Sequence, residues 1–593
     1  MTIASIRPSG GVTASSESMD FPVHPLGSQA KVLLCSVFGP YARDDEYGSR
    51  VINPMELWHN QVTRVQGPFS LRMFHRSWGL MLIQANIEAP CACLDFPSLD
   101  RFIQELRDNQ YDIVGISSIL PNLTKVKKMC ELIREHLPKA TIVVGGHITG
   151  LAELREYVDA DHIVRGDGVK WFRQFLGEDA DRPIRHPQIW AGIKRRSMGL
   201  DLPEDPRTAS AALIPSVGCP MGCNFCATSA MFGGKGNSVD FFPEAEGLFA
   251  VMSQLEESMK TRSFFVMDEN FLLNRPRAIK LLELMRKHEK PWTLYVFSSA
   301  NAIRQYTMEE LVGLGVSWLW LGLEGENSQY GKLKGTDSID LVASLQQHGI
   351  RVLGSTIIGL ETHTPQNIDQ AIARAVKHDC DFHQFMLYTP VAGTPLYKEH
   401  EDNGSLIPYP KASFADTHGQ FCFNFRHPHI PAGQETEFLL RAFNEDFRVN
   451  GPSVLRVAKT ALMGWRKYRN HPERRIRDRA EWEADGMATV FAGSLWAARR
   501  WFKDNKPLAQ RLDALLQEIF HDFGVKARIA APLIGRFVFW KLQREDKRLK
   551  AGWTYEPPTF YDRNHEQPGL NTGSNKATWV SGLAQEQEAM AAK

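Results

Sequence analysis

The chain has 593 residues, of which 43% are hydrophobic and 23% are charged, and its net charge is +1. This is the composition of an ordinary globular protein, long enough for about four domains of 150 residues. Nine cysteines over this length, three of them clustered, favour a reducing compartment over a disulfide scaffold. No apolar run approaches the ~20 residues of a membrane-spanning helix. Residues 1–28 are rich in Ser, Gly and Pro, and predict a disordered leader rather than a signal peptide.

Alternating apolar runs and helical segments follow from about residue 29. Runs of continuous β-branched residues, separated by helices of about a dozen residues, predict a doubly wound, flavodoxin/Rossmann-like α/β domain over residues 29–178. Ligands bind such sheets outside the carboxyl ends of the strands. The predicted strands are 31–37, 111–118, 141–147 and 162–164, and the predicted helices are 99–109 and 123–136.

A Pro- and charge-rich stretch, residues 179–207, is interpreted as a linker. A second series of strands and amphipathic helices follows it. Six strands in this series predict a (β/α)6 partial barrel within residues 208–425, with catalytic groups at the carboxyl ends of its strands. The predicted strands are 211–217, 263–267, 292–297, 318–323, 352–358 and 382–388.

The first run of the barrel delivers three closely spaced cysteines, Cys219, Cys223 and Cys226. Three thiolates at this spacing can bind three irons of a cubane cluster and leave the fourth iron open to a substrate or cofactor. The small residues Gly218 and Gly222 suit a tight wrap around such a cluster. Three buried small hydrophobes, a zinc site lacking its fourth ligand and half of a disulfide framework are the other interpretations.

This CxxxCxxC triplet, with Phe225 before its last cysteine, closely resembles that of the radical S-adenosylmethionine (SAM) superfamily. The resemblance, which extends from about Ala209 to Tyr397, implies a 4Fe-4S cluster on the three cysteines. In that family the open iron chelates the amino and carboxylate groups of SAM, and one electron cleaves SAM to a 5'-deoxyadenosyl radical. Phe225 is then expected among the SAM-binding residues.

The resemblance also assigns roles at the second strand end. Asp268, Glu269 and Asn270 stand where the family has a Gly-Gly-Glu-like segment that receives the methionine ammonium group. The alternative is local, because Asn270 and Asn274 are both good helix N-caps.

At the later strand ends the resemblance implies three further SAM contacts. Ser298 suits the SAM carboxylate and ribose, although the pair Ser298-Ser299 could form only a turn. Glu324 is expected near the ribose and sulfonium, against the alternative of a surface carboxylate. Gly359 matches the glycine that lets the backbone approach adenine.

The strand ends of the first domain resemble those of the cobalamin-binding domain found upstream of many radical SAM enzymes. The resemblance implies that six residues approach the corrin and its nucleotide tail: Ser117, Ser118, Gly145, Gly146, His147 and Gly166. No Asp-x-His-x-x-Gly string marks a lower ligand to cobalt. A lone His147 or Cys130 is more often structural than a metal ligand. A domain that has kept this fold and lost the cofactor is the alternative.

Residues 426–560 predict a mainly helical, basic C-terminal domain, followed by a disordered tail over 561–593. Residues 456–550 hold 22 Lys and Arg against 11 Asp and Glu, an excess of 11 that leaves the rest of the chain at −10. Aromatic residues accompany the bases in 495–503 and 537–541. This composition suits either a helix on an anionic membrane surface or a helical cap with solvated bases. Nucleic-acid binding is unlikely, because no RNA-binding module is evident.

These features predict a cobalamin-dependent (class B methylase-like) radical SAM enzyme, similar to lipid- and hopanoid-modifying members. We expect it to methylate an unactivated carbon of a hydrophobic, lipid or isoprenoid-type substrate. The alternatives are radical rearrangement, cyclisation or C–C coupling without methyl transfer, and a non-catalytic iron–sulfur adaptor. The expected partner is a reducing electron donor such as flavodoxin or ferredoxin. The expected location is cytoplasmic, with peripheral association at the inner face of the membrane as an option.

Overall fold

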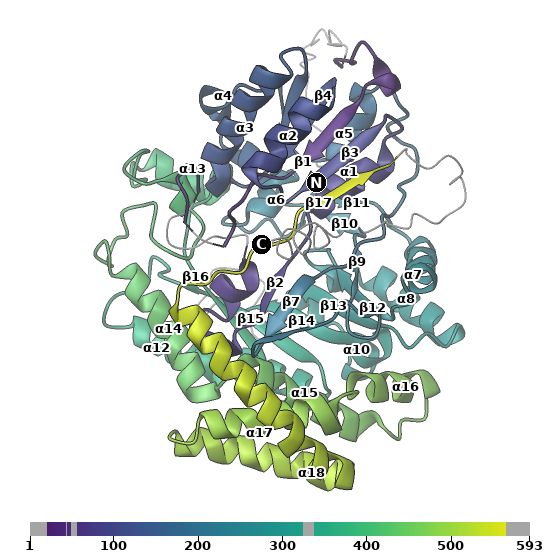
Figure 1. Cartoon of the computed structure of the whole chain (residues 1–593), viewed down its shortest axis with the longest axis vertical. Helices are drawn as coiled ribbons and strands as arrows, with labels where there is room; N and C mark the ends of the chain where they lie inside the picture. The colour runs from purple at the N-terminus through teal and green to yellow at the C-terminus, as the bar shows by residue number, and fades with distance from the viewer. Residues whose placement is uncertain (1–20, 43, 49–55, 324–336, 565–593) are drawn as a thin grey trace, which may run out of the picture.

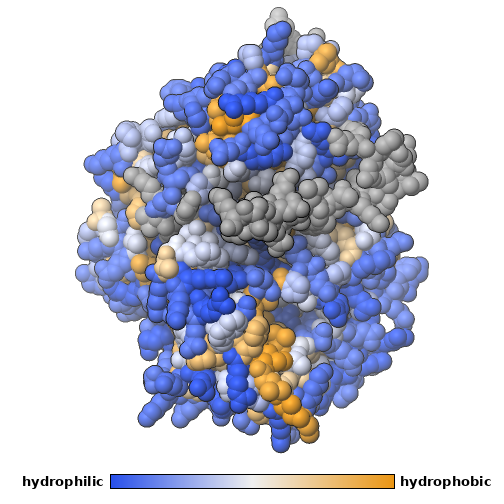
Figure 2. Space-filling view, in the orientation of Figure 1, coloured by the Kyte–Doolittle hydropathy of each residue, from blue (hydrophilic) through white to orange (hydrophobic). Residues whose placement is uncertain are grey.

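The computed structural model describes residues 21–42, 44–48, 56–323 and 337–564. An N-terminal α/β domain forms one end of the molecule, a barrel-like sheet lies in the middle, and the last helices form the other end (Figure 1). The face shown in Figure 2 is largely hydrophilic, but apolar side chains gather over the helical end.

The N-terminal sheet contains six strands in the order β17-β3-β1-β4-β5-β6, and all pairs except β17–β3 are parallel. The parallel strands therefore follow the flavodoxin-like order 2-1-3-4-5, as the sequence predicts. Helices cover both faces, since α2 and α3 pack on one and α1 and α5 on the other. The bounds are β1 Val32–Cys35, α1 Trp78–Asn86, β3 Cys91–Asp95, α2 Leu99–Asp108, β4 Ile113–Ser117, α3 Leu123–His136, β5 Thr141–Gly145, α4 Leu154–Tyr157, β6 His162–Val164 and α5 Gly168–Phe175.

The central sheet is parallel throughout and follows the chain order β9-β12-β13-β14-β15-β16, which confirms the predicted (β/α)6 partial barrel. Its strands are β9 Ala211–Leu213, β12 Ser263–Val266, β13 Thr293–Ser298, β14 Val316–Gly322, β15 Arg351–Ile358 and β16 Phe382–Leu387. The helices are α7 Ala245–Met259, α8 Arg275–Lys287, α9 Ala300–Ile303, α10 Met308–Leu314, α11 Ser338–Gln347, α12 Ile368–Lys377 and α13 Pro395–Asp402.

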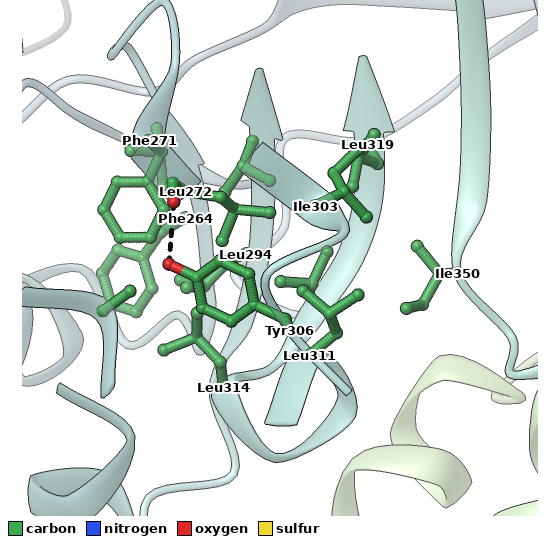
Figure 3. Packing of buried hydrophobic residues seen from close by; sticks show 14 of the residues in the cluster. Phe264, Phe271, Leu272, Leu294, Ile303, Tyr306, Leu311, Leu314, Leu319 and Ile350 are labelled. Atoms are coloured by element: carbon green, nitrogen blue, oxygen red, sulfur yellow. Dashed lines mark hydrogen bonds between the residues drawn. The ribbon is translucent and has the colours of Figure 1, made fainter. Parts of the chain in front are cut away.

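A continuous apolar core joins the outer face of this sheet to its helices. Strand residues such as Leu294 and Leu319 pack against Leu311 of α10 (Figure 3). The Tyr306 hydroxyl in this core is satisfied, because it donates a 2.8 Å hydrogen bond to the Leu272 carbonyl (Figure 3).

The inner face of the barrel is covered by a segment of the N-terminal domain, residues 56–78, rather than by barrel helices. This segment contains the π-helical turn η2 Trp58–Val62, the 3-10 turn η3 Gly67–Phe69 and strand β2 Arg72–Phe74. The Trp58 ring packs edge-on against Phe382 of β16 at 5.7 Å, and Trp318 of β14 stacks on the same Phe382. One domain therefore supplies part of the core of the other.

Three predicted boundaries differ from the structure. Residues 179–207, interpreted as a linker, contain β7 Ile193–Ser197 and β8 Leu200–Asp201, which form an antiparallel sheet with β2. Residues 561–563, assigned to a disordered tail, belong to β17 Phe560–Arg563, which pairs with β3. Residues 21–28 were assigned to the leader, yet His24 donates a backbone hydrogen bond to Phe175 of α5. In each case the partner is distant in sequence, so local composition does not reveal it.

The C-terminal helices form a cap on the barrel. They are α14 Glu435–Asn450, α15 Ser453–Tyr468, α16 Arg474–Glu483, α17 Ala492–Trp501 and α18 Lys506–Lys550, with a break in helical geometry at Gly524. Helix α14 contacts α12 and β16, and α17 packs along α18. Within the described ranges, we find no helix with the length and apolarity to span a bilayer.

Candidate active site

The three cysteines lie in a tight loop between β10 Ser216–Val217 and the short helix α6 Ala227–Met231. The backbone of Gly222 has φ +66°, and a Cβ atom there would lie 2.5 Å from the Cβ of Lys235. The Cys226 amide donates to the Cys223 carbonyl at 3.0 Å. The Cys226 sulfur accepts from the Ser229 amide at 3.5 Å, which caps α6. The loop thus needs glycine to close on itself.

The donor set of this loop fits an iron–sulfur cluster. Cys219, Cys223 and Cys226 are half-buried, whereas Cys130 is fully buried in the N-terminal core and is structural. Burial raises the pKa of the Cys219 thiol to about 11, and the thiols of Cys226 and Cys223 also raise it, so the three sulfurs share one region. No three His, Cys, Asp or Glu residues of the described segments converge on a single metal ion. Cysteines of a cubane bind three different irons instead.

Asp268 and Glu269, which the sequence assigns to one role, have different environments. The Asp268 carboxylate is buried and accepts a 2.6 Å hydrogen bond from the Arg277 guanidinium of α8. It also accepts from the Asn270 amide at 3.0 Å. Because Arg277 already neutralises it, Asp268 fixes the loop to α8 and does not offer a free charge to a ligand.

Glu269 is the member of the pair that faces the cysteine loop. Its carboxylate accepts a hydrogen bond from the Gly218 amide, while its buried Oε2 atom has no hydrogen-bond partner among the described residues. Burial, with a smaller contribution from the nearby Asp268, raises the pKa of this carboxyl to about 8. The residue that binds this carboxylate, Gly218, directly precedes Cys219, so the unpartnered Oε2 atom lies close to the cysteine loop. A buried carboxyl oxygen in this position fits an ammonium group such as that of SAM.

Asn270 ties two strand ends together. Its Oδ1 atom accepts from the Ser298 hydroxyl at 3.0 Å and from the Ser299 amide at 3.1 Å. The side chain of Asn270 caps no helix, whereas Asn274 caps α8 and Ser299 caps α9. The predicted SAM residues Asn270 and Ser298 are therefore hydrogen-bonded to each other at the carboxyl edge of the barrel sheet. Helix capping is the role of Asn274 and Ser299 instead.

The remaining predicted SAM residues have separate outcomes. Glu324 lies outside the described residues. Gly359 has φ +77°, and a Cβ atom there would lie 2.5 Å from the Phe423 ring, so packing by Phe423 already explains the glycine. Phe225 is half-buried and packs against the core that contains Ile358 at the end of β15.

The strand ends of the N-terminal sheet face the helix that follows the cysteines. His147 Nε2 lies 3.2 Å from the Thr228 hydroxyl of α6. Burial lowers the pKa of His147, so the neutral imidazole is favoured. The Arg165 guanidinium donates to the Ala230 carbonyl of α6 at 2.9 Å. Both contacts join the edge of one sheet to the cysteine loop of the other.

The predicted cobalamin residues lie along this edge. Ser117 ends β4 beside Gly145 of β5. Gly146 has φ +85°, and a Cβ atom there would lie 2.5 Å from the Ser118 carbonyl oxygen, so only glycine fits against Ser118. Gly166 has φ +93° and, like Arg165, follows β6.

A cavity of about 850 Å³ lies where the two domains meet. Its lining comes from the N-terminal domain, from the cysteine loop with α6 and the segment after it, and from α13 with the turn before it, and includes Gly150, Glu153, Arg165, Cys223, Lys235 and Tyr397. The domains also touch directly, because a Cβ atom on Gly150 would lie 2.4 Å from the Ala392 carbonyl oxygen. A cavity of this size at a domain boundary, beside the carboxyl ends of parallel strands, suits a cofactor or substrate.

Sequence reasoning missed three residues that build the site. Arg165 was adjacent to a predicted residue, and its place directly after a strand end was a usable signal. Thr228 and Arg277 act through partners about 80 and nine residues away in sequence, respectively. Neither residue lies in a motif that would have marked it.

Two family models match the chain. The B12 binding domain matches residues 75–176, and the Radical SAM superfamily model matches residues 213–375. These matches imply a 4Fe-4S cluster, SAM and cobalamin as cofactors. The first match contains β3 to β6 of the N-terminal sheet but not β1, and the second contains β12 to β15 of the central sheet but not β16.

Several curated proteins are similar to this chain. An uncharacterized methyltransferase of Pyrococcus horikoshii is 26% identical over 350 residues, which are 53% of this chain and 74% of that protein. The bacteriochlorophyllide d C-8(2)-methyltransferase of Chlorobaculum tepidum is 24% identical over 50% of this chain and 70% of its own length. The hopanoid C-2 methylase of Rhodopseudomonas palustris is 21% identical over 56% and 62%.

Among solved structures, the chain is similar to a radical S-adenosylmethionine methyltransferase, TsrM, of Kitasatospora setae, with cobalamin and a 4Fe-4S cluster bound. The likeness has a TM-score of 0.46 and 16% sequence identity, and it covers 77% of this chain and 99% of that protein.

Proposed function

We propose that this chain, which belongs to the radical SAM superfamily and carries an N-terminal B12-binding domain, methylates an unactivated carbon of a hydrophobic, lipid- or isoprenoid-type substrate. When bound, the cluster with SAM supplies a radical that removes a hydrogen atom from such a carbon, and cobalamin supplies a transferable methyl group. A carbon with no acidic proton and no nucleophilic character requires this kind of chemistry.

The observation that carries the proposal is the contact between the two sheet edges. The side chains of His147 and Arg165 reach Thr228 and the Ala230 carbonyl of α6, the helix that begins directly after Cys226. A substrate that receives a methyl group at a radical carbon must be reached from both domains. The shared cavity, lined by both Arg165 and Cys223, is the place where one molecule can meet both.

The chain's own residues have distinct roles in this proposal. Cys219, Cys223 and Cys226 hold the cluster, and Glu269 holds the SAM ammonium group with its unpartnered oxygen. Asn270 fixes the adjoining strand ends, since it accepts hydrogen bonds from both Ser298 and Ser299.

The inner face of the barrel supports a hydrophobic substrate. On β13 the outward-facing Leu294 and Val296 are fully buried, whereas the inward-facing Tyr295 and Phe297 keep some exposure. On β14 the inward-facing Trp318 and Trp320 likewise keep some exposure. Residues 56–78 already pack on this face through Trp58, so a ligand would contact only the part of these aromatic rings that this segment leaves accessible. Relatives named for bacteriochlorophyllide and hopanoid methylation favour the same substrate class.

The reaction also requires a partner that delivers single electrons. A reduced flavodoxin or ferredoxin is the class of donor that can serve a cluster held in a half-buried loop.

The substrate class is tested by comparing lipid extracts of a deletion strain and its parent by mass spectrometry. The proposal expects a lipid that is lighter by one methylene in the deletion strain, with restoration by the wild-type gene and no restoration by Cys226→Ala. Unchanged lipids would refute the substrate class. A lipid changed in structure but not by a methylene would favour rearrangement or cyclisation over methylation.

A further inference from the structure

The second half of α18 exposes a continuous apolar face. Five large hydrophobic side chains are 45% to 71% exposed: Val525, Ile529, Leu533, Phe537 and Trp540. At about 100° per residue they fall within an arc of about 120° on one side of the helix. In the space-filling view a run of apolar side chains follows the course of this helix (Figure 2).

The opposite side of the same helix is packed normally. Ala527, Ala531, Val538 and Leu542 are buried in the core shared with α17. Helix α18 is therefore apolar on two sides, and among the described residues only one of these sides is covered. A soluble surface helix ordinarily has one apolar stripe, so the second stripe calls for an external partner.

Within residues 525–544 the charged side chains are all of one sign. Residues 525–544 contain five basic residues, Lys526, Arg528, Arg536, Lys541 and Arg544, and no acidic residue. The nearest acid, Glu545, is buried and occupied by Arg196 at 2.6 Å. In the portion of the chain that the structure covers, no ion pair engages the five bases. A partner for this face must supply apolar depth and negative charge together.

The aromatic residues of the stripe lie beside bases. The Arg544 guanidinium is 4.9 Å from the centre of the Trp540 ring, and Lys541 Nζ is 5.6 Å from both the Trp540 and Phe537 rings. Aromatic rings flanked by long basic side chains match the headgroup layer of a bilayer, where rings sit at the boundary and bases reach phosphates.

We propose that this face, residues 525–544 of α18, docks the protein on an anionic lipid bilayer, with the helix axis parallel to the membrane plane. A second copy of the chain is a poor occupant, because a two-fold contact would place five cations against five cations. A nucleic acid offers charge but no apolar depth for Val525, Ile529 and Leu533. The inference goes beyond the proposed methylation and does not depend on it.

Flotation of the full chain with vesicles tests this docking. We expect binding to vesicles of phosphatidylglycerol and phosphatidylcholine at least about tenfold tighter than to phosphatidylcholine alone, and weaker as salt rises. The pair Ile529→Glu and Leu533→Glu should reduce binding at least about tenfold, since both side chains are exposed and their loss spares the core. The matched control Val449→Glu, at a 39% exposed site on α14, should bind as wild type.

A second pair of substitutions separates the electrostatic contribution to vesicle binding from the contribution of the apolar side chains. The double variant with Arg536→Glu and Arg544→Glu should lose the preference for phosphatidylglycerol. Both double variants should keep the wild-type circular dichroism spectrum. The proposal is overturned if the wild type does not bind either vesicle, or if all variants bind equally. It is also overturned if light scattering shows a dimer that Leu533→Glu dissociates, because a second copy would then cover this face.

Discussion

The two parallel sheets of this chain differ in what covers them. In the N-terminal sheet, α2 and α3 pack on one face and α1 and α5 on the other. In the barrel, helices pack on the outer face, and the inner face receives residues 56–78 of the N-terminal domain. The strand orders of the two sheets also differ. In the first sheet, β3 lies on one side of β1 and the later parallel strands β4, β5 and β6 lie on the other side, whereas in the second sheet each strand is added on the same side as the one before it.

This difference determines where chemistry can be placed. A sheet covered on both faces leaves its carboxyl edge as the open surface, and that edge faces α6 through His147 and Arg165. The barrel keeps an interior whose aromatic side chains remain partly accessible. The two domains therefore contribute an edge and an interior to one site, and each can be altered separately.

The largest expected effect comes from the cysteine loop at the edge of the barrel. Cys226→Ala should lower formation of 5'-deoxyadenosine by about 1000-fold or more, because one iron of the cluster loses its ligand. The assay uses anaerobic protein, dithionite and SAM. Cys422→Ala, also half-buried but outside the loop, should remain within about twofold of wild type. Deoxyadenosine formation by Cys226→Ala at the wild-type rate would contradict the site.

The next effect distinguishes the two neighbouring carboxyl groups. Glu269→Gln should weaken SAM binding by about 100-fold with unchanged iron content, because an amide cannot lose a proton to become the buried carboxylate that pairs with the ammonium group. Equilibrium binding of SAM measures this.

Asp268→Asn is the informative contrast to Glu269→Gln. It leaves Arg277 buried without its partner and should cost about 3 kcal/mol of unfolding free energy. If Glu269→Gln and Asp268→Asn lost SAM affinity equally and lost stability equally, the assignment of SAM binding to Glu269 and of a structural role to Asp268 would be wrong.

A smaller effect is expected at the contact between the domains. Gly150→Ala places a methyl group against the Ala392 carbonyl oxygen and should cost about 1 to 3 kcal/mol of unfolding free energy through overpacking. Methylated product should fall about tenfold while deoxyadenosine formation persists, because the two edges are pushed apart. Gly79→Ala, where no atom lies within 4 Å of the new methyl group, is the control. A parallel fall in both products would show that Gly150 does not couple the domains.

The last effect is a dependence of stability on pH and concerns the segment inside the barrel. Burial lowers the pKa of His75 to about 4, while the neutral ring accepts from the Trp58 indole at 2.8 Å. Because an unfolded histidine titrates near 6.5, the unfolded chain binds more protons between these values. Stability is therefore complete above pH 6.5 and should fall by about 3 kcal/mol as the pH is lowered to 4.

Urea unfolding at several pH values measures this contribution. His75→Gln should be less stable at pH 7 yet lose less stability on acidification. An identical pH slope in the variant would show that His75 is not the titrating group.

Local pattern was sufficient for the elements and for the cysteine loop. Helix 123–136 is found as predicted, and all six barrel strands lie within two residues of their predicted starts. Short-range spacing also marked Cys219, Cys223 and Cys226, which the structure places together in one loop; their role as cluster ligands stays a prediction.

Long-range pairing limited the rest of the prediction. The pairing of β17 with β3 joins residues more than 450 positions apart, and the β2–β7 ladder crosses about 120 positions. The division between Asp268 and Glu269 depends on Arg277, whose side chain returns from the next helix. Composition and periodicity contain no information on such partners, so the linker and tail were assigned as unstructured.

The central claim is that the cofactor-bearing edges of the two sheets face each other across one cavity. Electron paramagnetic resonance of the protein loaded with Co(II) cobalamin and a reduced cluster tests this directly. We expect the cluster to accelerate relaxation of the cobalt signal in the wild type and not in Cys226→Ala. A cobalt signal that relaxes identically in both, at full occupancy of cobalamin in both proteins and of the cluster in the wild type, would contradict the account.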